Sequence, residues 1–240
     1  MKARNPIPDC LACSHRECSF FANIPAAQMQ QISESKGGNF FKKGQQIFYE
    51  GMRPFGVFCI HQGKVKVYKI ESGGQEQIVR FAKEGDIIGY KALILNQPYT
   101  AFASALEDAT ICFIPREQFV KMIHEDPQLS MRLMQKLSAE LAEAEQRLTE
   151  MAQKPVRERL AENLLMLSDF FGLEGDGHTL AVRLTREDLA HFVGTATETA
   201  IRFLYEMKSE GLIDLKGRQI KILDKAGILR RAGMGLPYSG

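Results

Sequence analysis

The cysteines are the residues best suited to metal or redox chemistry, because three of the five fall within nine positions. Cys10, Cys13 and Cys18 stand in the segment CLACSHREC, which follows Pro6 and Pro8. Clustered cysteines in a chain without an export signal indicate metal or redox chemistry rather than disulfides. Thiolates are soft donors that suit zinc and iron–sulfur centres, and the short step from Cys10 to Cys13 lets both sulfurs reach one metal centre.

Three thiolates leave one position of a four-ligand site empty, so a distant fourth ligand is needed. The candidates are His15 and the two remaining cysteines, Cys59 and Cys112. Both cysteines stand in apolar, strand-like segments, VFCIHQ and ATICFIP, where a cysteine can equally be a small buried hydrophobe. The residues alone leave the choice open.

A second group of candidate residues could read DNA. Glu198 and Arg202 are one helical turn apart, and Thr195, Thr197 and Thr199 stand beside the expected start of the same helix. Arginine can bind guanine through two hydrogen bonds, glutamate can accept from the cytosine amine, and threonine can contact phosphates. The alternative is a Glu–Arg surface pair, which stabilises a helix by only about 0.2–0.5 kcal/mol.

The segment around these residues decides between the two interpretations. Thr185 and Asp188 form a capping-box pattern that predicts a helix start, and Gly194 supplies a left-handed turn position. A second helix is expected from Thr197 to about Glu210, followed by two short strands over 212–223. Two helices joined by a glycine turn and followed by a hairpin are typical of a winged helix-turn-helix, whose second helix enters the major groove.

Two further segments are expected to position these sites. Residues 24–116 alternate apolar and polar positions between glycines about ten residues apart, which predicts a barrel or roll of short strands. A long helix is expected after Pro127 and is broken at Pro155. Its apolar residues recur in steps of three and four, as in a coiled-coil seam, so we expect self-pairing rather than the inner face of a bundle. The seam consists of Met134, Leu137, Leu141, Ala144, Leu148 and Met151.

The run Glu198-Thr199-Ala200-Ile201-Arg202, preceded by Val193-Gly194, resembles the DNA-reading helix of the CRP/FNR transcription regulators. That resemblance implies that Glu198 and Arg202 read a TGA-type half-site, with Thr195, Thr197 and Thr199 beside them. FNR-type members have serine where this chain has Ile201. Isoleucine can pack on a thymine methyl group but cannot donate a hydrogen bond, so we expect a different contact to the outer base.

FNR-type regulators also carry an N-terminal cysteine triad and one later cysteine just before a short Ile-Pro segment, and Cys112-Phe-Ile-Pro115 matches that place. The resemblance implies an iron–sulfur cluster, [4Fe–4S], held by Cys10, Cys13, Cys18 and Cys112. The gap from Cys13 to Cys18 is one residue shorter than in the best-known members. Zinc or metal-free redox thiols are the alternatives.

The roll resembles the cyclic-nucleotide-binding domain of the same family, but its ligand residues differ. Tyr90 follows Gly89 where the family has glutamate, and Thr100-Ala101 stand where it has Arg-Ser. A buried cyclic phosphate would lack its bidentate arginine. We therefore expect no cAMP binding, and a pocket that is vestigial or filled by side chains such as Tyr90 and Tyr99.

These interpretations give an α+β chain with four parts. We expect a cysteine-rich sensory segment at 1–20, a cyclic-nucleotide-binding-like β-roll at 21–118, a long dimerisation helix at 119–153 and a C-terminal winged helix-turn-helix domain at 154–240. Within the last part, the tail after Lys225 is rich in glycine and is expected to be loosely ordered. The expected partners are palindromic double-stranded DNA, a second copy of the chain and, by resemblance, RNA polymerase.

Composition adds only broad limits. The 240 residues are 45% hydrophobic and 25% charged with a net charge of +2, as in ordinary globular proteins. No apolar run reaches the length of a membrane span, and the N-terminus lacks the apolar core of a secretion signal, so a cytoplasmic location without membrane contact is expected. No enzyme motif is present. Two other functions stay open: a regulator sensing another effector in the roll and, less favoured, a thiol oxidoreductase using Cys10 and Cys13.

Overall fold

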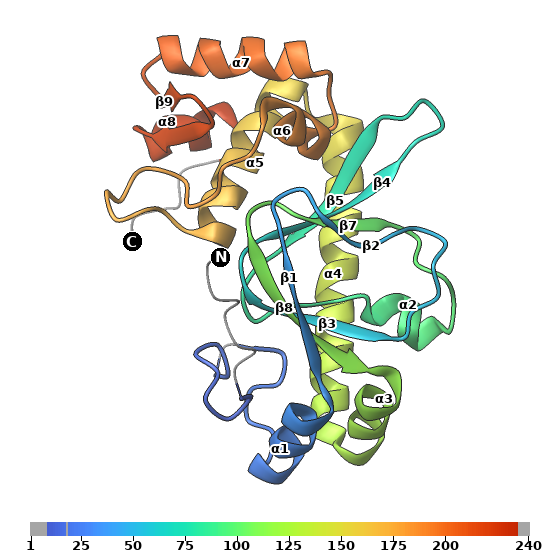
Figure 1. The fold of residues 1–240 in the computed structure, drawn as a ribbon. Coiled ribbons are helices and arrows are strands. Elements are labelled where there is room, and N and C mark those ends of the chain that lie inside the picture. The colour runs from blue at the N-terminus through green and yellow to red at the C-terminus, as the bar shows by residue number, and fades with distance from the viewer. Residues whose placement is uncertain (1–8, 18, 235–240) are drawn as a thin grey trace. The chain divides into compact units, whose positions relative to one another are not determined.

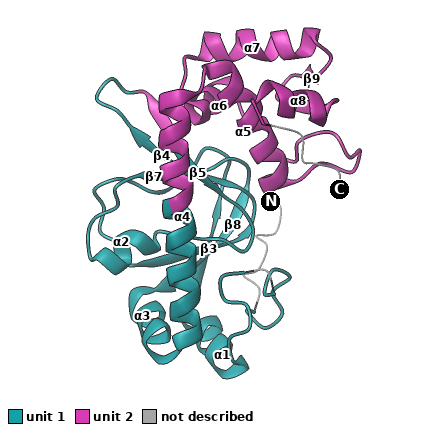
Figure 2. Cartoon of the chain, turned by 180° about the vertical axis from the view of Figure 1, so that it is seen from behind, with its two compact units in different colours: residues 1–74, 78–141 teal, residues 75–77, 142–240 magenta. Residues whose placement is uncertain are grey.

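Short antiparallel strands build the first part of the chain and helices build most of the second (Figure 1). The structure is a computed structural model that describes residues 9–17 and 19–234. Backbone contacts divide it into two units (Figure 2). The first holds the residues up to 74 together with 78–141, and the second holds 75–77 together with the residues from 142 onward.

The first unit contains two four-stranded sheets. The first sheet has the order β1-β8-β3-β6, with bounds Gly37–Phe41, Ala109–Pro115, Gly56–Gln62 and Ile87–Ile88. The second sheet has the order β2-β7-β4-β5, with bounds Gln46–Phe48, Phe102–Ala105, Val65–Ile70 and Glu76–Ala82. The expected roll of short strands is therefore confirmed.

One apolar core joins strands of the two sheets and includes Phe48, Ile60, Val65 and Ile111. Glycine is required at the β3–β4 turn. Gly63 has a φ of +98°, and a Cβ there would lie 2.9 Å from the backbone carbonyl oxygen of Asp108. A side chain at that position would strain the turn and collide with the neighbouring loop.

Helices cover the other face of the first sheet. A second apolar core contains Ile32 from α1 (Ala26–Ser35), Phe119 from α3 (Arg116–Glu125) and Leu129 from α4 (Pro127–Gln153), packed with Val57 and Ile114 of the sheet. A short helix, α2 (Tyr90–Leu95), adds Tyr90 and Leu93 to this core. The same core contacts Cys10 and Cys59.

The range 119–153 holds most of α3 and all of α4 rather than one helix, and the chain bends between them at Asp126. The Asp126 carboxylate accepts from the amides of Gln128 and Leu129 at 2.9 and 3.1 Å, which caps the start of α4. No described helix is long and apolar enough to cross a membrane.

The second unit is built on α5 (Val156–Phe171), whose Leu160, Leu164 and Leu167 are fully buried. The remaining elements are α6 (Arg186–Val193), α7 (Thr197–Ser209), β9 (Ile213–Lys216), β10 (Gln219–Ile222) and α8 (Lys225–Arg231). The hairpin β9–β10 supplies the expected wing.

The tail is more ordered than its glycines indicate, so the expectation of a loose segment after Lys225 is wrong for residues 225–231. These form α8, which the Asp224 side chain caps by accepting from Gly227 at 2.8 Å. Ile228 is fully buried, and α8 packs against α5. The cap and one apolar side chain outweigh the low helix propensity of Gly227.

Candidate functional site

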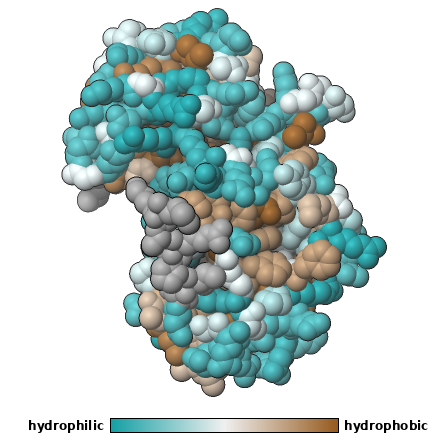
Figure 3. Space-filling model, viewed as in Figure 1, coloured by the Kyte–Doolittle hydropathy of each residue, from teal (hydrophilic) through white to brown (hydrophobic). Residues whose placement is uncertain are grey.

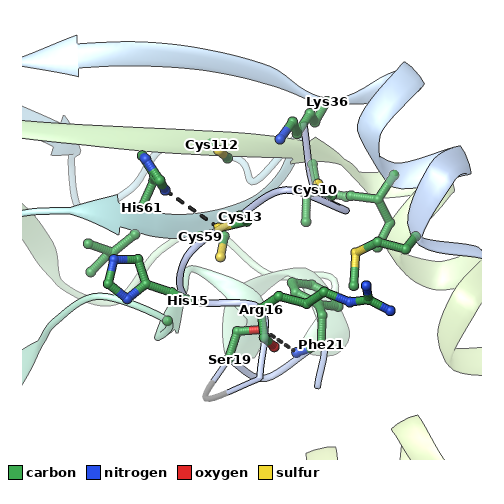
Figure 4. A pocket seen from close by; sticks show the side chains of 15 residues that line it. Cys10, Cys13, His15, Arg16, Ser19, Phe21, Lys36, Cys59, His61 and Cys112 are labelled. Atoms are coloured by element: carbon green, nitrogen blue, oxygen red, sulfur yellow. Dashed lines mark hydrogen bonds between the residues drawn. The ribbon is translucent and has the colours of Figure 1, made fainter. Parts of the chain in front are cut away.

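Four cysteine side chains meet at one cavity of about 40 Å³ beside the first sheet (Figure 4). Cys10 and Cys13 come from the segment before α1, while Cys59 and Cys112 come from the adjacent strands β3 and β8. The structure thus brings together three of the four expected ligands. The fourth, Cys18, lies outside the described residues.

The strands place Cys59 and Cys112 by their alternation. Side chains two residues apart point to the same face of a strand. Val57 and Ile114 belong to the core on the helix-covered face, so Cys59 and Cys112 lie on that face as well. The two cysteines are also direct partners in the antiparallel register of β3 and β8. The sequence left Cys59 as either a candidate ligand or a buried hydrophobe. In the structure its side chain lines the same cavity as the other three cysteines.

The cysteine segment is held against the sheet by polar contacts. The Cys10 amide donates to Ser33 Oγ at 3.1 Å, and Cys13 Sγ lies 3.5 Å from His61 Nδ1 (Figure 4). His15, which the sequence offers as a candidate fourth ligand, makes an edge-to-face contact with His61, with ring centroids 5.8 Å apart. His61 follows Cys59 by two residues, and sequence reasoning gave it no role.

Burial controls the charge of the strand thiols. Desolvation raises the pKa of Cys59 far above its usual range, and the neighbouring Cys112, Cys13 and Cys10 raise it further. Burial also raises the pKa of Cys112, which Lys36 partly offsets. Desolvation, His15 and Lys36 lower the pKa of His61, so its ring is neutral near pH 7. A metal would therefore have to displace thiol protons on binding.

The residues around the cavity fit a thiolate-bound metal centre. In the described ranges, no group of three or more His, Cys, Asp or Glu side chains has an arrangement that could hold a metal ion as it stands. The donor set nevertheless consists of soft sulfurs, and no described lining residue is a carboxylate. Lys36 and Arg16 supply positive charge, while Phe21, Met29 and Ile32 supply an apolar wall. Such surroundings suit a negatively charged iron–sulfur cluster.

Tyr90 and Tyr99 do not fill the pocket that corresponds to the family's nucleotide site. A cavity of about 270 Å³ remains between strands of the roll and α2, with Tyr90 and Tyr99 in its lining. Tyr99 stacks on Phe48 at 4.1 Å between centroids, and burial raises the Tyr99 pKa to about 12. Arg80 of β5 also lines this cavity, at a position that the family's phosphate motif does not mark.

Glu140 of α4 contacts three of the residues that line this cavity. Its carboxylate contacts Arg80, accepts from the Tyr90 hydroxyl at 2.5 Å and lies 2.6 Å from Lys91 Nζ. Lys136 Nζ is 3.5 Å away. The heptad pattern assigns Glu140 to the polar face of the long helix, but its side chain is only 13% exposed. It ties α4 to β5 and α2 within the first unit.

The helix-turn-helix forms where the sequence predicts it. Thr185 accepts from the Asp188 amide at 2.9 Å, and Asp188 accepts from the Thr185 amide at 3.2 Å. Gly194 has a φ of +72°, a backbone conformation that side-chain-bearing residues adopt only with strain, so this turn favours glycine. Arg159 of α5 secures the turn by donating to the carbonyl oxygens of Val193 and Gly194 at 3.2 and 3.0 Å.

The two predicted base-reading side chains point away from the core of the second unit. Glu198 is exposed, and the Arg202 side chain is 66% exposed, whereas Ala200 and Leu204 are fully buried. Arg202 Nε lies 4.0 Å from a carboxylate oxygen of Glu206, one turn further along α7. Arg202 therefore pairs with Glu206 and not with Glu198, the surface partner that the sequence offered as the alternative to DNA reading. Ile201 is half-buried. The three threonines predicted to contact phosphates are half-buried too, and they stand at or just before the start of α7: Thr195, Thr197 and Thr199.

Most of the apolar seam of α4 has no core to cover it. Figure 3 shows one face of the molecule, on which hydrophilic residues predominate and hydrophobic ones form smaller patches. Along α4, by contrast, Leu141 is 61% and Leu148 69% exposed. Met134, Ala144 and Met151 are also exposed. Leu137 is half-buried because it packs on the core that contacts the cysteines.

Two parts of the chain match known domain families. Residues 39–126 match a family described as the cyclic nucleotide-binding domain, and residues 158–231 match one described as the Crp-like helix-turn-helix domain. The electron transport regulator A of Shewanella oneidensis is 33% identical over 82% of this chain and 78% of its own length. The fumarate and nitrate reduction regulatory protein of Vibrio cholerae is 31% identical over 86% of this chain and 82% of its own. A solved CRP/FNR-family regulator from Thermus thermophilus is 28% identical, with a TM-score of 0.69 over 82% of this chain and 98% of its own.

Proposed function

We propose that this chain, which belongs to the CRP/FNR family of transcription regulators, binds palindromic DNA as a homodimer under the control of an iron–sulfur cluster. The family consists of regulators rather than enzymes, which leaves a thiol oxidoreductase without support. One observation carries the sensing part of the proposal. The thiols of Cys10, Cys13, Cys59 and Cys112 share a cavity on a face of the roll that is joined to the long helix.

DNA reading rests on α7. Its exposed Glu198 and Arg202 are free to meet base edges, because the opposite face of the helix is buried. Thr195, Thr197 and Thr199 stand at the helix start, where hydroxyls and backbone amides can contact phosphates. Two copies related by a two-fold axis would present two such helices to half-sites about one helical turn apart.

Sensing and pairing share one core. Cys10 and Cys59 pack against the same apolar cluster as Leu129 and Leu133 of α4, and the seam residue Leu137 also contacts it. When bound, an iron–sulfur cluster supplies reactivity toward oxygen and nitric oxide. Cys10, Cys13, Cys18 and Cys112 would hold it, with Lys36 balancing its charge. A change in the cysteine segment would then reach the α4 seam through side-chain packing. RNA polymerase contact and a cytoplasmic location are further parts of this proposal.

Purification without air tests the sensing part. We expect brown protein with about four iron and four sulfide per chain, which loses its colour in air. Elemental analysis and absorbance spectra measure this directly. Colourless protein with one zinc per chain would contradict an iron–sulfur sensor.

The roll cavity favours a second candidate function. Its volume of about 270 Å³ suits a small effector other than cAMP, and Lys69 lines it together with Arg80 and Lys91, which also pair with Glu140. In that case, the cysteines would bind zinc or nothing. Metal-free protein that still responds to an anionic metabolite by binding its operator would support this function.

Replacing Arg202 with alanine tests base reading. We expect a loss of about 1–3 kcal/mol in binding to the specific site and relaxed preference at the guanine, because a bidentate base contact is removed. Titrations of the variant with specific and random duplexes measure both effects. An equal loss on the two duplexes would indicate a phosphate contact instead.

A further inference from the structure

We propose that Cys59 is a fifth thiol of the metal site and that Cys59 and Cys112 are interchangeable donors for the same ligand position. This inference rests on the proposed function, since it needs a metal centre at the cysteines. It departs from the ligand set that the family resemblance implies, in which Cys112 alone serves the roll side of the cluster.

The register of the first sheet places the two cysteines opposite each other on one face. Cys59 and Cys112 are direct cross-strand partners on β3 and β8, and both line the cavity that Cys10 and Cys13 line (Figure 4). Side chains directly opposite in an antiparallel pair have their Cβ atoms about 4.5–5.5 Å apart. The two thiols are therefore neighbours on one face of the sheet, and either could face a metal bound at the shared cavity.

Cys59 is not simply a core residue. Val57, two residues earlier on the same face of β3, is fully buried, whereas Cys59 is only partly buried. Its sulfur borders the cavity on the side of the cysteine segment (Figure 4). Its side chain also packs against the second apolar core, so a packing role and a ligand role are compatible at this position.

Space and charge also permit the exchange. On β1, the cross-strand partner of Cys112 is Gly38, which has no side chain to restrict movement of the Cys112 sulfur. Lys36 lies at the same cavity and would balance a thiolate at either position. No described lining residue is a carboxylate that would repel one.

The exchange is a ligand substitution without electron transfer. When Cys59 served as the ligand, it would give up its thiol proton and Cys112 would be the protonated, unbound thiol. When Cys112 served, the two roles would be reversed. In either case one strand thiolate would be bound and one strand thiol would keep its proton, so charge and protons balance.

Four proteins purified without air test the proposal: the parent chain, Cys112→Ala, Cys59→Ser and Cys112→Ala/Cys59→Ser. Serine keeps the shape of Cys59 but replaces the soft sulfur with a poorer donor for iron. We expect each single variant to keep at least about half of the parent's iron and sulfide, and the double variant to fall below about a tenth. Far-ultraviolet circular dichroism and thermal unfolding of the metal-free forms check that all four fold alike.

The outcomes separate this inference from the proposed function. A parent chain without iron would overturn both. An iron-loaded parent with either single variant as empty as the double variant would overturn only the interchange of Cys59 and Cys112. A double variant as full as the parent would also overturn it, because neither strand thiol would then be a ligand.

Discussion

Leu141→Asp should give a chain that folds normally but stays monomeric and binds palindromic DNA at least about a hundredfold more weakly. The seam residue is 61% exposed, so the substitution removes no contact that the single chain needs. In a paired helix, however, two aspartates would lie close together in an apolar interface. A buried, unpaired charge costs several kcal/mol, and each 1.4 kcal/mol is tenfold in affinity.

Sedimentation at micromolar concentration measures the assembly, and titration with a full palindrome and a single half-site measures the affinity. Ala142→Asp is the matched control, because Ala142 is exposed on the same helix but lies off the seam. That control should dimerise and bind like the parent. A dimeric Leu141→Asp variant would mean that the seam is not the pairing surface.

The parts of the molecule that the sequence predicts well depend on near neighbours in the chain. Thr185 and Asp188 are three residues apart, and their capping box involves only the first turn of α6. Gly194 meets a local backbone requirement. The exposure of Glu198 and Arg202 follows from the period of one helix. These short-range rules suffice for the reading module.

The parts that it does not predict depend on contacts between distant segments. The sequence leaves Cys59 as either a candidate ligand or a buried strand hydrophobe, and only the register with β8, more than fifty residues later, sets it beside Cys112. Glu140 reads as a surface residue of a heptad until Arg80, sixty residues earlier, is found at its carboxylate. A pattern of hydrophobicity fixes which face of a strand or helix is buried but not which strand lies next to it.

Glu140→Ala should lower the free energy of unfolding by about 3–5 kcal/mol, because it leaves Arg80 buried without its counter-charge. The Arg80 side chain is only 18% exposed, and of its hydrogen bonds it would keep the one to the Ile87 carbonyl oxygen, which carries no full charge. Tyr90 loses the acceptor of its hydroxyl as well. Urea titration of the metal-free protein measures the change. Glu143→Ala removes an exposed pair with Arg147 on the same helix and should change stability by less than about 0.5 kcal/mol.

The stability that Glu140 supplies should also depend on pH. Burial opposes ionisation of its carboxyl, but Arg80, Lys91 and Tyr90 outweigh that effect and lower the pKa below its ordinary value of 4.5. A group whose pKa is lowered by folding stabilises the fold fully above its unfolded pKa and loses that effect as the pH falls through the folded value. The difference in stability between the parent and Glu140→Ala should therefore be constant near neutral pH and shrink below the ordinary value of 4.5. A difference that stays the same into strong acid would show that Glu140 stabilises α4 by packing and not by its charge.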